Sequence, residues 1–527
     1  MGQLTKHYLL LFLGVMWAMS WSVMAKQVDW LIQSDRIYTG DRQGPYQGVV
    51  VIDKGLITHV GPHLPENIHP LESIDATGLV VSAGFIDPHT HACRDFNGGP
   101  GNLNANYLTQ GVTSVFCNND GGGPADVVTQ MSRYQRQGVG TNVALYVGHN
   151  SVRKAVIGMA NRPPTEAELE QMREKVALAM KHGAMGLSSG LYYVPGSYAQ
   201  INEVIALAEV VQQYGGHYDS HIRDESSYSV GLLASVNEVI TVAEQAGIAA
   251  NISHIKALGV DVWGQSKEVV ALINQARERG LRITADQYPW LASGSSITAA
   301  LIPAWARADG HEALIRRLED PAHHKTIKAQ VQDNLRRRGG ADALLFTDAT
   351  MPQYQGKTLK QLALESQRSA VDMAIAIVKE GKGDGVASFN MQQQDVKHFM
   401  MQDWTMTSSD GSSGHPRKYA SFPRKYTQYV KENSVLSLEG FLYRSSTLAA
   451  QTFALGKRGK LKNGYVADVV IFDPARFAAR ATYLQPQQHS SGVEWLWVNG
   501  QAAVARGKVT GIKAGQVIKR SANALAQ

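Results

Sequence analysis

Short apolar strands and amphipathic helices alternate through the middle of this chain, and this pattern constrains the fold more than any other feature. The apolar segment 113–117 precedes a predicted helix over 125–138, whereas the strand 142–147 is expected to lead into a loop. Four more predicted helices are each followed by a predicted strand: 165–182 by 186–189, 200–214 by 216–221, 233–246 by 249–254, and 265–280 by 282–286. Repeated strand–helix units of this kind are typical of a (β/α)8 barrel.

Both ends of the chain consist instead of short apolar strands and turns without a helical period. We expect residues 26–80 and 455–527 to pair into one small β-sandwich, with the barrel occupying residues 81–454. The strand–helix pattern is interrupted at about 299–397, which reads as mostly helix and loop, and such insertions commonly cover a site. The predicted fold class is therefore α/β, a TIM-like barrel with a small β-sandwich domain.

The composition is that of a globular enzyme. The 527 residues are 44% hydrophobic and 18% charged, which permits a large core and excludes a disordered chain. The net charge is +6, but the Lys and Arg residues are scattered, and the only dense run, Arg336 to Arg338, lies in a polar helical segment. A solvated helix face explains this run better than a nucleic-acid site does, so we expect no nucleic-acid partner.

The first 25 residues resemble an export signal, with Lys6, an apolar stretch over 9–17 and small residues near position 25. The apolar stretch is short for a membrane span and no later segment is long enough. We expect an exported protein, periplasmic or secreted, without stable membrane insertion; cleavage and anchoring of the signal both stay open. Two cysteines, Cys93 and Cys117, are too few for a disulfide-built fold, although they could pair.

Metal-binding residue types follow the ends of several predicted strands. His89 and His91 come two residues apart after the apolar segment 85–86, so both imidazoles point to one side. Three more strand ends carry His221, His254 and Asp410. Barrel enzymes gather their chemistry at the carboxyl ends of the strands, and imidazoles with a carboxylate favour zinc, although other divalent ions fit.

Several segments, in order along the chain, resemble a known family. GFIDPHTH (84–91) resembles the first-strand signature of the amidohydrolase superfamily. The N-acyl-D-amino-acid deacylase (D-aminoacylase) branch is similar at GLSSGL (186–191), SHIRDE (220–225), ISHIK (252–256), DQYP (286–289), SDG (409–411), HPR (415–417) and ADVVIFD (467–473). The resemblance covers nearly the whole chain after the signal.

The resemblance implies a role for each matching residue. His89 and His91 would hold one metal position, and His221 and His254 the other. Asp410 would be the catalytic acid/base, taking a proton from water and giving it to the leaving nitrogen. Four further residues would contact the substrate: Arg417 would hold its carboxylate, Lys256 and Tyr288 would add donors, and Tyr193 would contribute as a better match than Tyr192.

Two positions depart from the family pattern. Asp120 aligns where these deacylases carry a metal-binding Cys, while Cys117 comes three residues too early. We favour Asp120 as the ligand, with one or two zinc ions per chain; alternatively Asp120 caps a turn and the site holds one metal. The family's substrate-contacting Ser falls nearest Gly294, so Ser293, Ser295 or neither would take its place.

The implied activity is metal-dependent hydrolysis of the amide bond of N-acyl-D-amino acids, small molecules, by a zinc amidohydrolase. Three alternatives stay open: a dipeptidase for peptides with a C-terminal D-residue, a cyclic-amide hydrolase of the dihydroorotase or hydantoinase kind, and an inactive barrel that binds metal or ligand. The absence of an obvious lysine for carbamylation at Ser188–Ser189 and the presence of HPR (415–417) speak against the cyclic-amide alternative.

Overall fold

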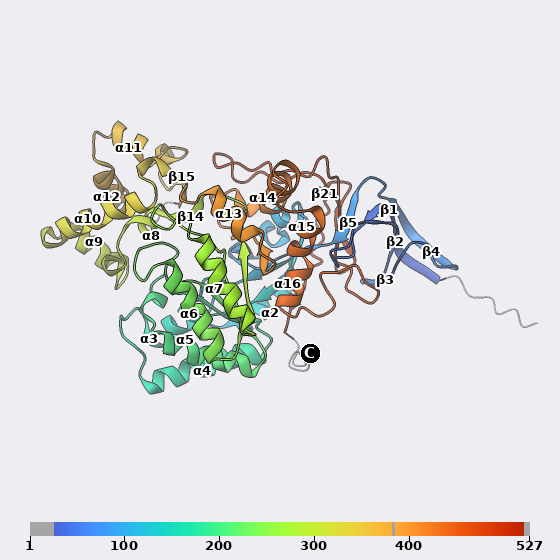
Figure 1. Ribbon diagram of the computed structural model, residues 1–527, viewed down its shortest axis with the longest axis horizontal. Coiled ribbons are helices and arrows are strands. Elements are labelled where there is room, and N and C mark those ends of the chain that lie inside the picture. The colour runs from blue at the N-terminus through green and yellow to red at the C-terminus, as the bar shows by residue number, and fades with distance from the viewer. Residues whose placement is uncertain (1–25, 382–384, 521–527) are drawn as a thin grey trace, which may run out of the picture.

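The computed structural model describes residues 26–381 and 385–520 (Figure 1). The expected export signal, residues 1–25, lies outside the described residues. The described chain is a mixed α/β protein whose strands form four sheets: two parallel sheets, one sheet shared by the two ends of the chain, and one small antiparallel sheet.

Two parallel sheets form the centre of the molecule. One has the strand order β17-β13-β12-β11-β10-β9 and the other β22-β8-β7-β6. An isolated parallel bridge between Thr90 and Gly411 links the segments that follow β6 and β17. Because the strands run parallel, their carboxyl ends lie on one side. The strands are β6 (Phe85–Asp87), β7 (Val112–Cys117), β8 (Asn142–Leu145), β9 (Val147–Gly148), β10 (Gly186–Gly190), β11 (His217–His221), β12 (Ala249–Ile252), β13 (Ile283–Gln287), β17 (Thr405–Thr407) and β22 (Val517–Ile518).

Helices follow most of these strands in the chain, as the apolar spacing predicts. The five expected helices are present as α2 (Val127–Gln137), α4 (Glu166–Lys181), α5 (Ile201–Gln213), α6 (Leu232–Gln245) and α7 (Ser266–Glu278). At the start of α4, Thr165 accepts from the backbone N–H of Glu168, whose side chain accepts from the Thr165 N–H, so the two residues form a capping box.

The loop expected after residue 147 is wrong, because α3 (His149–Ile157) begins there. Its buried residues are mostly polar, including His149, Asn150 and Arg153, so an apolar period does not reveal it. The remaining helices after β6 and around β17 are α1 (Ala105–Leu108), α13 (Gln393–Met400), α14 (Arg417–Arg424), the π-helix η7 (Lys425–Glu432), α15 (Leu438–Ser445) and α16 (Thr447–Thr452).

Strands from the two ends of the chain share one nine-stranded sheet, at the right of Figure 1. β5 pairs antiparallel with β18, so strands from the two ends of the chain are hydrogen-bonded to each other. The last described strand, β22, leaves this sheet and pairs with β8. The sheet consists of β1 (Lys26–Ile37), β2 (Tyr46–Asp53), β3 (Leu56–Gly61), β4 (Ile68–Asp75), β5 (Val80–Ala83), β18 (Val469–Phe472), β19 (Val493–Val498), β20 (Gln501–Ala505) and β21 (Lys508–Val509).

The residues that interrupt the strand–helix pattern fold into a separate group of helices and strands, from β14 to β16, at the upper left of Figure 1. It contains strands as well as helices: a small antiparallel sheet of order β14-β16-β15, built from β14 (Ser293–Ser296), β15 (Leu344–Asp348) and β16 (Gly385–Ser388). Its helices, with an apolar core of their own, are α8 (Ile297–Leu301), α9 (His311–Glu319), α10 (Pro321–Arg337), α11 (Leu359–Glu365) and α12 (Ala370–Glu380).

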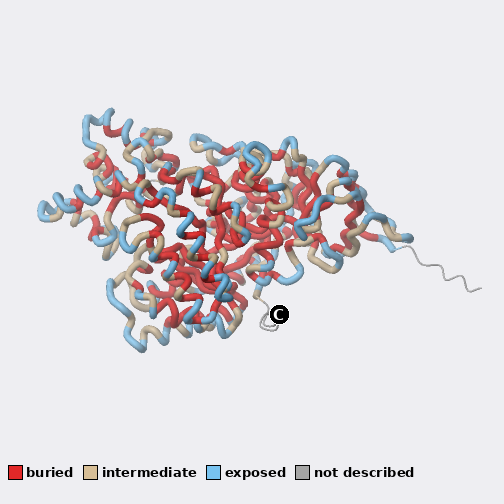
Figure 2. Tube along the Cα trace, in the orientation of Figure 1, coloured by how far each residue is buried: buried red, intermediate tan, exposed pale blue. Residues whose placement is uncertain are grey.

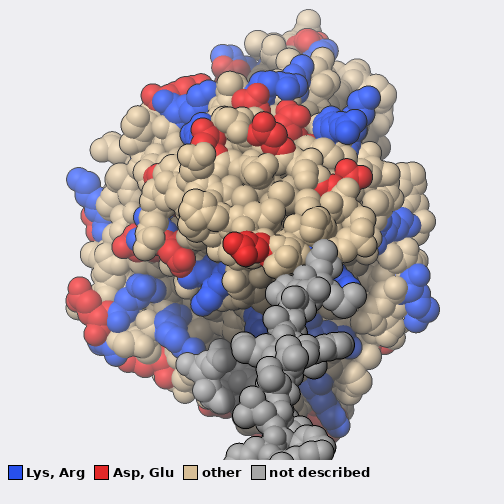
Figure 3. Space-filling view, turned by 90° about the vertical axis from the view of Figure 1, so that its right-hand side faces the viewer, with Lys and Arg blue, Asp and Glu red and all other residues tan. Residues whose placement is uncertain are grey.

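Burial and charge are distributed as in an ordinary globular protein. Buried residues fill the central sheets and the middle of each attached body, with exposed residues outside them (Figure 2). On the face that carries the terminal sheet, basic and acidic side chains are interspersed around a largely uncharged area (Figure 3). Within the described residues, no helix is both long enough and apolar enough to cross a membrane.

Candidate metal centre

The expected ligand residues all follow the carboxyl ends of the parallel strands. His89 and His91 follow β6, His221 ends β11, His254 comes two residues after β12, and Asp410 comes three residues after β17. Three of the predicted site residues have a positive φ: +35° at His254, +46° at Asp410 and +57° at Asp120. Non-glycine residues adopt this left-handed conformation rarely, and it is enriched at functional sites.

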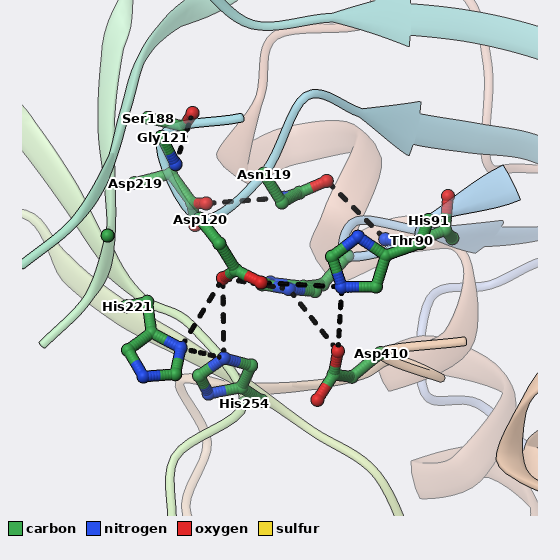
Figure 4. Close-up of polar contacts among 12 residues, drawn as sticks. Thr90, His91, Asn119, Asp120, Gly121, Ser188, Asp219, His221, His254 and Asp410 are labelled. Carbon is green, nitrogen blue, oxygen red and sulfur yellow. Dashed lines mark hydrogen bonds and ion pairs between the residues drawn. The ribbon is translucent and has the colours of Figure 1, made fainter. Parts of the chain in front are cut away.

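Asp120 lies in the middle of the four imidazoles (Figure 4). Its Oδ1 is 3.3 Å from His89 Nε2, 3.4 Å from His254 Nε2 and 3.5 Å from His221 Nδ1. Its Oδ2 is 3.3 Å from His91 Nε2. The carboxylate therefore faces both expected metal positions at once.

Cys117 takes no part in this cluster. Its sulfur is bonded to Cys93, and neither cysteine is free. A metal-binding thiolate is not available from Cys117 while this bond is intact. Of the two alternatives for the ligand at the end of β7, the structure brings only Asp120 to the histidines.

Asp410 lies between the histidine cluster and Arg417. Its Oδ1 is 3.3 Å from His91 Nε2 and 3.7 Å from His89 Nε2, while its Oδ2 is 2.6 Å from a guanidinium nitrogen of Arg417. Arg417 also donates to the Ser412 hydroxyl at 3.0 Å. One carboxylate oxygen thus faces the histidines and the other is held by the cation.

Glu225 is a member of the site that the sequence analysis missed. It is buried, and its Oε1 is 2.5 Å from Lys256 Nζ and 3.1 Å from His254 Nδ1. Lys256 Nζ is itself 2.8 Å from His254 Nδ1. The spacing of Glu225, four residues after His221 in SHIRDE, is the signal that could have identified it.

A buried polar network supports the cluster from within the sheet. Asn251 donates to Asp219 Oδ1 at 2.8 Å and to Asp286 Oδ2 at 2.7 Å. Asp286 Oδ1 accepts from the backbone N–H of His254 at 3.0 Å, and Asn119 donates to Asp219 Oδ2 at 3.2 Å. Because every one of these groups is paired, the loops that carry His254 and Asp120 are held in place.

The electrostatics of the cluster favour bound positive charge. Burial alone would lower the pKa of His89, but the carboxylates of Asp120, Asp286 and Asp410 raise it to about 10. Burial would raise the pKa of Asp120, yet His89 and hydrogen bonds from His221 and His254 hold it well below its usual range. The carboxylates therefore stay ionised. Their negative charge favours a positive charge in the cluster, either a proton on an imidazole or a bound metal ion.

The donor set fits a divalent metal ion. Both ring nitrogens of His89 and the Oδ1 of Asp120 are buried, and the contacts of this oxygen with the imidazoles, 3.3 to 3.5 Å long, lack good hydrogen-bond geometry. Ligand atoms of His89, Asp120, His254 and Asp410 lie within 4.8 Å of one another, as do those of His221, Glu225 and His254. Imidazole nitrogens and carboxylate oxygens are the ligands of catalytic zinc sites.

A cavity of about 590 Å³ opens over the cluster. Its walls include all four expected substrate contacts, Tyr193, Lys256, Tyr288 and Arg417. The Tyr193 ring packs on His221 at 4.6 Å, and the Tyr288 ring lies 4.9 Å from the Arg417 guanidinium with its hydroxyl buried and unpartnered. Ser293, Gly294 and Ser295 all line the same cavity, so both candidate serines reach it.

Known proteins are similar to this chain over most of its length. The model of the amidohydrolase family matches residues 72–504. D-aminoacylase from Alcaligenes xylosoxydans xylosoxydans is 28% identical over 85% of this chain and 89% of its own length. N-acyl-D-glutamate deacylase from the same organism is 30% identical over 85% of this chain and 88% of its own.

A solved structure agrees with these relatives. N-acyl-D-glutamate deacylase from Bordetella bronchiseptica, in complex with zinc and a phosphonate inhibitor that mimics the tetrahedral intermediate, is 28% identical to this chain. It covers 94% of this chain and 100% of its own, with a TM-score of 0.78. The similarity therefore extends over both the central sheets and the bodies attached to them.

Proposed function

This chain belongs to the amidohydrolase family, and from that premise we propose that it hydrolyses the amide bond of N-acyl-D-amino acids, using one or two zinc ions. The observation that carries the proposal is the position of Asp410, which lies between the histidine cluster and Arg417. A proton-transferring carboxylate, a metal site and a carboxylate-binding cation are what this reaction needs, and here they line one cavity.

The finer architecture is part of the proposal. The two parallel sheets would form one (β/α)8 barrel over residues 81–454, because β8 and β9 are nearly continuous and the Thr90–Gly411 bridge links the outer strands. Residues 26–80 and 455–527 would form the β-sandwich, and residues of about 299–397 the insertion. In such a barrel the ligands share one mouth because all strands end there.

Five residues would hold the metal: His89, His91, Asp120, His221 and His254. A zinc ion bound by them would lower the pKa of a water molecule to about 7 and polarise the scissile carbonyl. Asp120, which faces histidines of both pairs, would bridge the two positions if both are filled. Glu225, held by Lys256, would accept from the Nδ1–H of His254 and so leave the Nε2 lone pair for the ion.

Asp410 would act as the general base and then as the general acid. Its Oδ1 faces the histidines, where it can accept a proton from water, while Arg417 holds Oδ2 and fixes the rotamer. Burial would raise the pKa of Asp410, but Arg417, His254, His91 and His89 outweigh it and keep the carboxylate ionised. The proton then goes to the amide nitrogen, which leaves as a neutral amine because an amide anion is a poor leaving group.

The substrate's α-carboxylate would bind beside Arg417. Asp410 and Ser412 contact the two terminal nitrogens of the guanidinium, but its Nε–H and the Tyr288 hydroxyl are buried without partners, so both can donate to a carboxylate. Lys256 lies in the same wall, but its ammonium is already bound by Glu225. A dipeptide with a C-terminal D-residue offers the same amide and carboxylate, so it is the second substrate class we propose.

Export is the last part of the proposal. It is supported by the signal-like sequence of residues 1–25 and by the Cys93–Cys117 bond, since disulfides persist in oxidising compartments. Fractionation of cells that make the full chain, with N-terminal sequencing of the product, tests it.

A purified-enzyme screen tests the activity. N-acetyl-D- and N-acetyl-L-amino acids and D-residue dipeptides are compared at equal concentration, with metal content measured on the same sample. We expect hydrolysis of D-substrates in proportion to bound zinc. Preference for L-substrates, or metal uptake without hydrolysis of any member, would contradict the proposal.

A further inference from the structure

Arg338 is a buried cation in the wall of the substrate cavity. It follows directly after α10 in the insertion, and only 3% of its surface is exposed. Within the part of the chain that the structure describes, it forms no ion pair with a carboxylate. Its neighbours are neutral: Nε donates to the Ala300 carbonyl at 3.2 Å, and its guanidinium lies 5.7 Å from the centre of the Tyr228 ring. The Asn390 side-chain amide, turned so that its oxygen faces Arg338, accepts from Nη1 at 3.2 Å.

The two preceding arginines show that this arrangement is specific to Arg338. Arg336 forms ion pairs with Asp261 at 2.5 Å and Asp333 at 3.0 Å, and Arg337 pairs with Asp333 at 2.5 Å. The interpretation of the run as a solvated helix face therefore describes Arg336 well and partly describes Arg337. It is wrong for Arg338, which turns inward.

The other charged groups deep in the cavity are already paired. Lys256 is bound by Glu225, and Arg417 by Asp410. Arg94, Lys154 and Asp348 also line the cavity, but they are exposed. A buried charge without a counter-ion is expensive, so an anion that enters the cavity would gain a strong interaction with Arg338.

Two tyrosines connect Arg338 to the metal centre. The Tyr192 ring lies 5.9 Å from the His221 ring and 5.8 Å from the Tyr228 ring, which in turn lies against Arg338. The Tyr228 hydroxyl is also buried and lies within hydrogen-bonding reach of the Arg338 guanidinium, so the two polar groups lie side by side in this wall. Arg338 therefore lies on the side of the cavity that Tyr192 and Tyr228 form, whereas Arg417 lies beside Tyr288.

We propose that Arg338 recognises a second anionic group of the substrate, distinct from the α-carboxylate, so that this enzyme prefers N-acyl-D-amino acids carrying an additional carboxylate. The inference rests on the proposed deacylase function. The second carboxylate would belong to the side chain, as in D-glutamate or D-aspartate, or to the acyl group, as in a succinyl chain. Either source offers the same planar anion to the guanidinium.

The test compares acidic substrates with neutral ones of equal shape. The kcat/KM is measured for N-acetyl-D-glutamate against N-acetyl-D-glutamine, and for N-succinyl-D-leucine against its amide N-succinamoyl-D-leucine, with wild type, Arg338→Met and the matched surface variant Arg336→Met. We expect wild type to prefer the acidic member of one pair by about 100-fold, the magnitude of a buried charge-assisted pair. R338M should remove that preference through KM and leave the neutral substrates within about threefold, while R336M behaves as wild type.

The outcomes separate this inference from the function on which it rests. A preference in the first pair assigns the carboxylate to the side chain, and one in the second pair assigns it to the acyl group. Equal or better hydrolysis of the neutral members by wild type overturns the inference and leaves the deacylase function standing; this comparison decides even if R338M does not fold. An equal loss on all substrates in folded R338M, with metal content unchanged, would also overturn it. No hydrolysis of any N-acyl-D-amino acid would overturn both.

Discussion

Cys93 and Cys117 are joined by a disulfide bond that ties together two segments of the candidate metal centre. Cys93 comes two residues after His91, and Cys117, at the end of β7, comes three residues before Asp120. The two Cα atoms are 5.9 Å apart. The bond therefore limits how far His91 and Asp120, whose nearest atoms are 3.3 Å apart, can separate.

Replacing both cysteines, Cys93→Ser with Cys117→Ser, is expected to weaken metal binding and stability together. Loss of a bond that spans 24 residues should lower the free energy of unfolding by about 3 kcal/mol. Metal affinity should fall about tenfold, because the two loops then have to be ordered by the ion. Urea unfolding and chelator competition measure the two effects. An affinity equal to that of wild type would show that the bond does not position the ligands.

Asp120→Asn tests whether the central carboxylate is a ligand. Asn keeps the shape but loses the charge that faces four imidazoles, so we expect less bound metal per chain and a kcat/KM lower by at least about 100-fold. Elemental analysis and kinetics measure the two. The matched control is Asp348→Asn, an exposed carboxylate in the same cavity, which should retain its full metal content. Full metal loading of Asp120→Asn would return Asp120 to the role of a turn cap.

His217 should make the fold sensitive to acid. It lies at the opposite end of β11 from His221, and burial, together with the charges of Arg282 and Arg520, lowers its pKa from 6.5 to about 4. The unfolded chain therefore takes up this proton first as the pH falls below about 6.5. Stability is lost from there down to about pH 4, where the folded form also protonates, for a total of about 3 kcal/mol.

The measurement is the free energy of unfolding from pH 7.5 to pH 4 for wild type and His217→Gln, with the exposed His63→Gln as control. The difference between wild type and H217Q should shift in favour of the variant by about 3 kcal/mol over this window, while H63Q follows wild type. Parallel curves for all three proteins would show that His217 does not titrate as the structure implies.

Regular patterns in the sequence were enough to locate the strand ends and most helices. His89 and His91, His221, His254 and Asp410 could be singled out because each comes at or shortly after the end of a predicted strand. The helix α3 was missed because its buried side chains are mostly polar. The strands β14 to β16 were missed because they are short and β14 reads Ser-Gly-Ser-Ser, which has little β propensity.

Other features depend on contacts that no local pattern reports. Glu225 becomes part of the site only when β11 and β12 pair and bring Lys256 beside it. Arg338 looks like the other two arginines in its run until the insertion folds against the cavity. These positions are set by packing between distant segments.

Asp410→Asn tests the central claim most directly. The variant keeps the size of the side chain but cannot accept the proton, and elemental analysis and thermal unfolding establish that metal and fold are retained. We expect kcat for the best N-acyl-D-amino acid to fall about 1,000-fold, within the range for loss of general acid–base catalysis. A metal-loaded Asp410→Asn that keeps kcat within a few-fold of wild type would contradict the account.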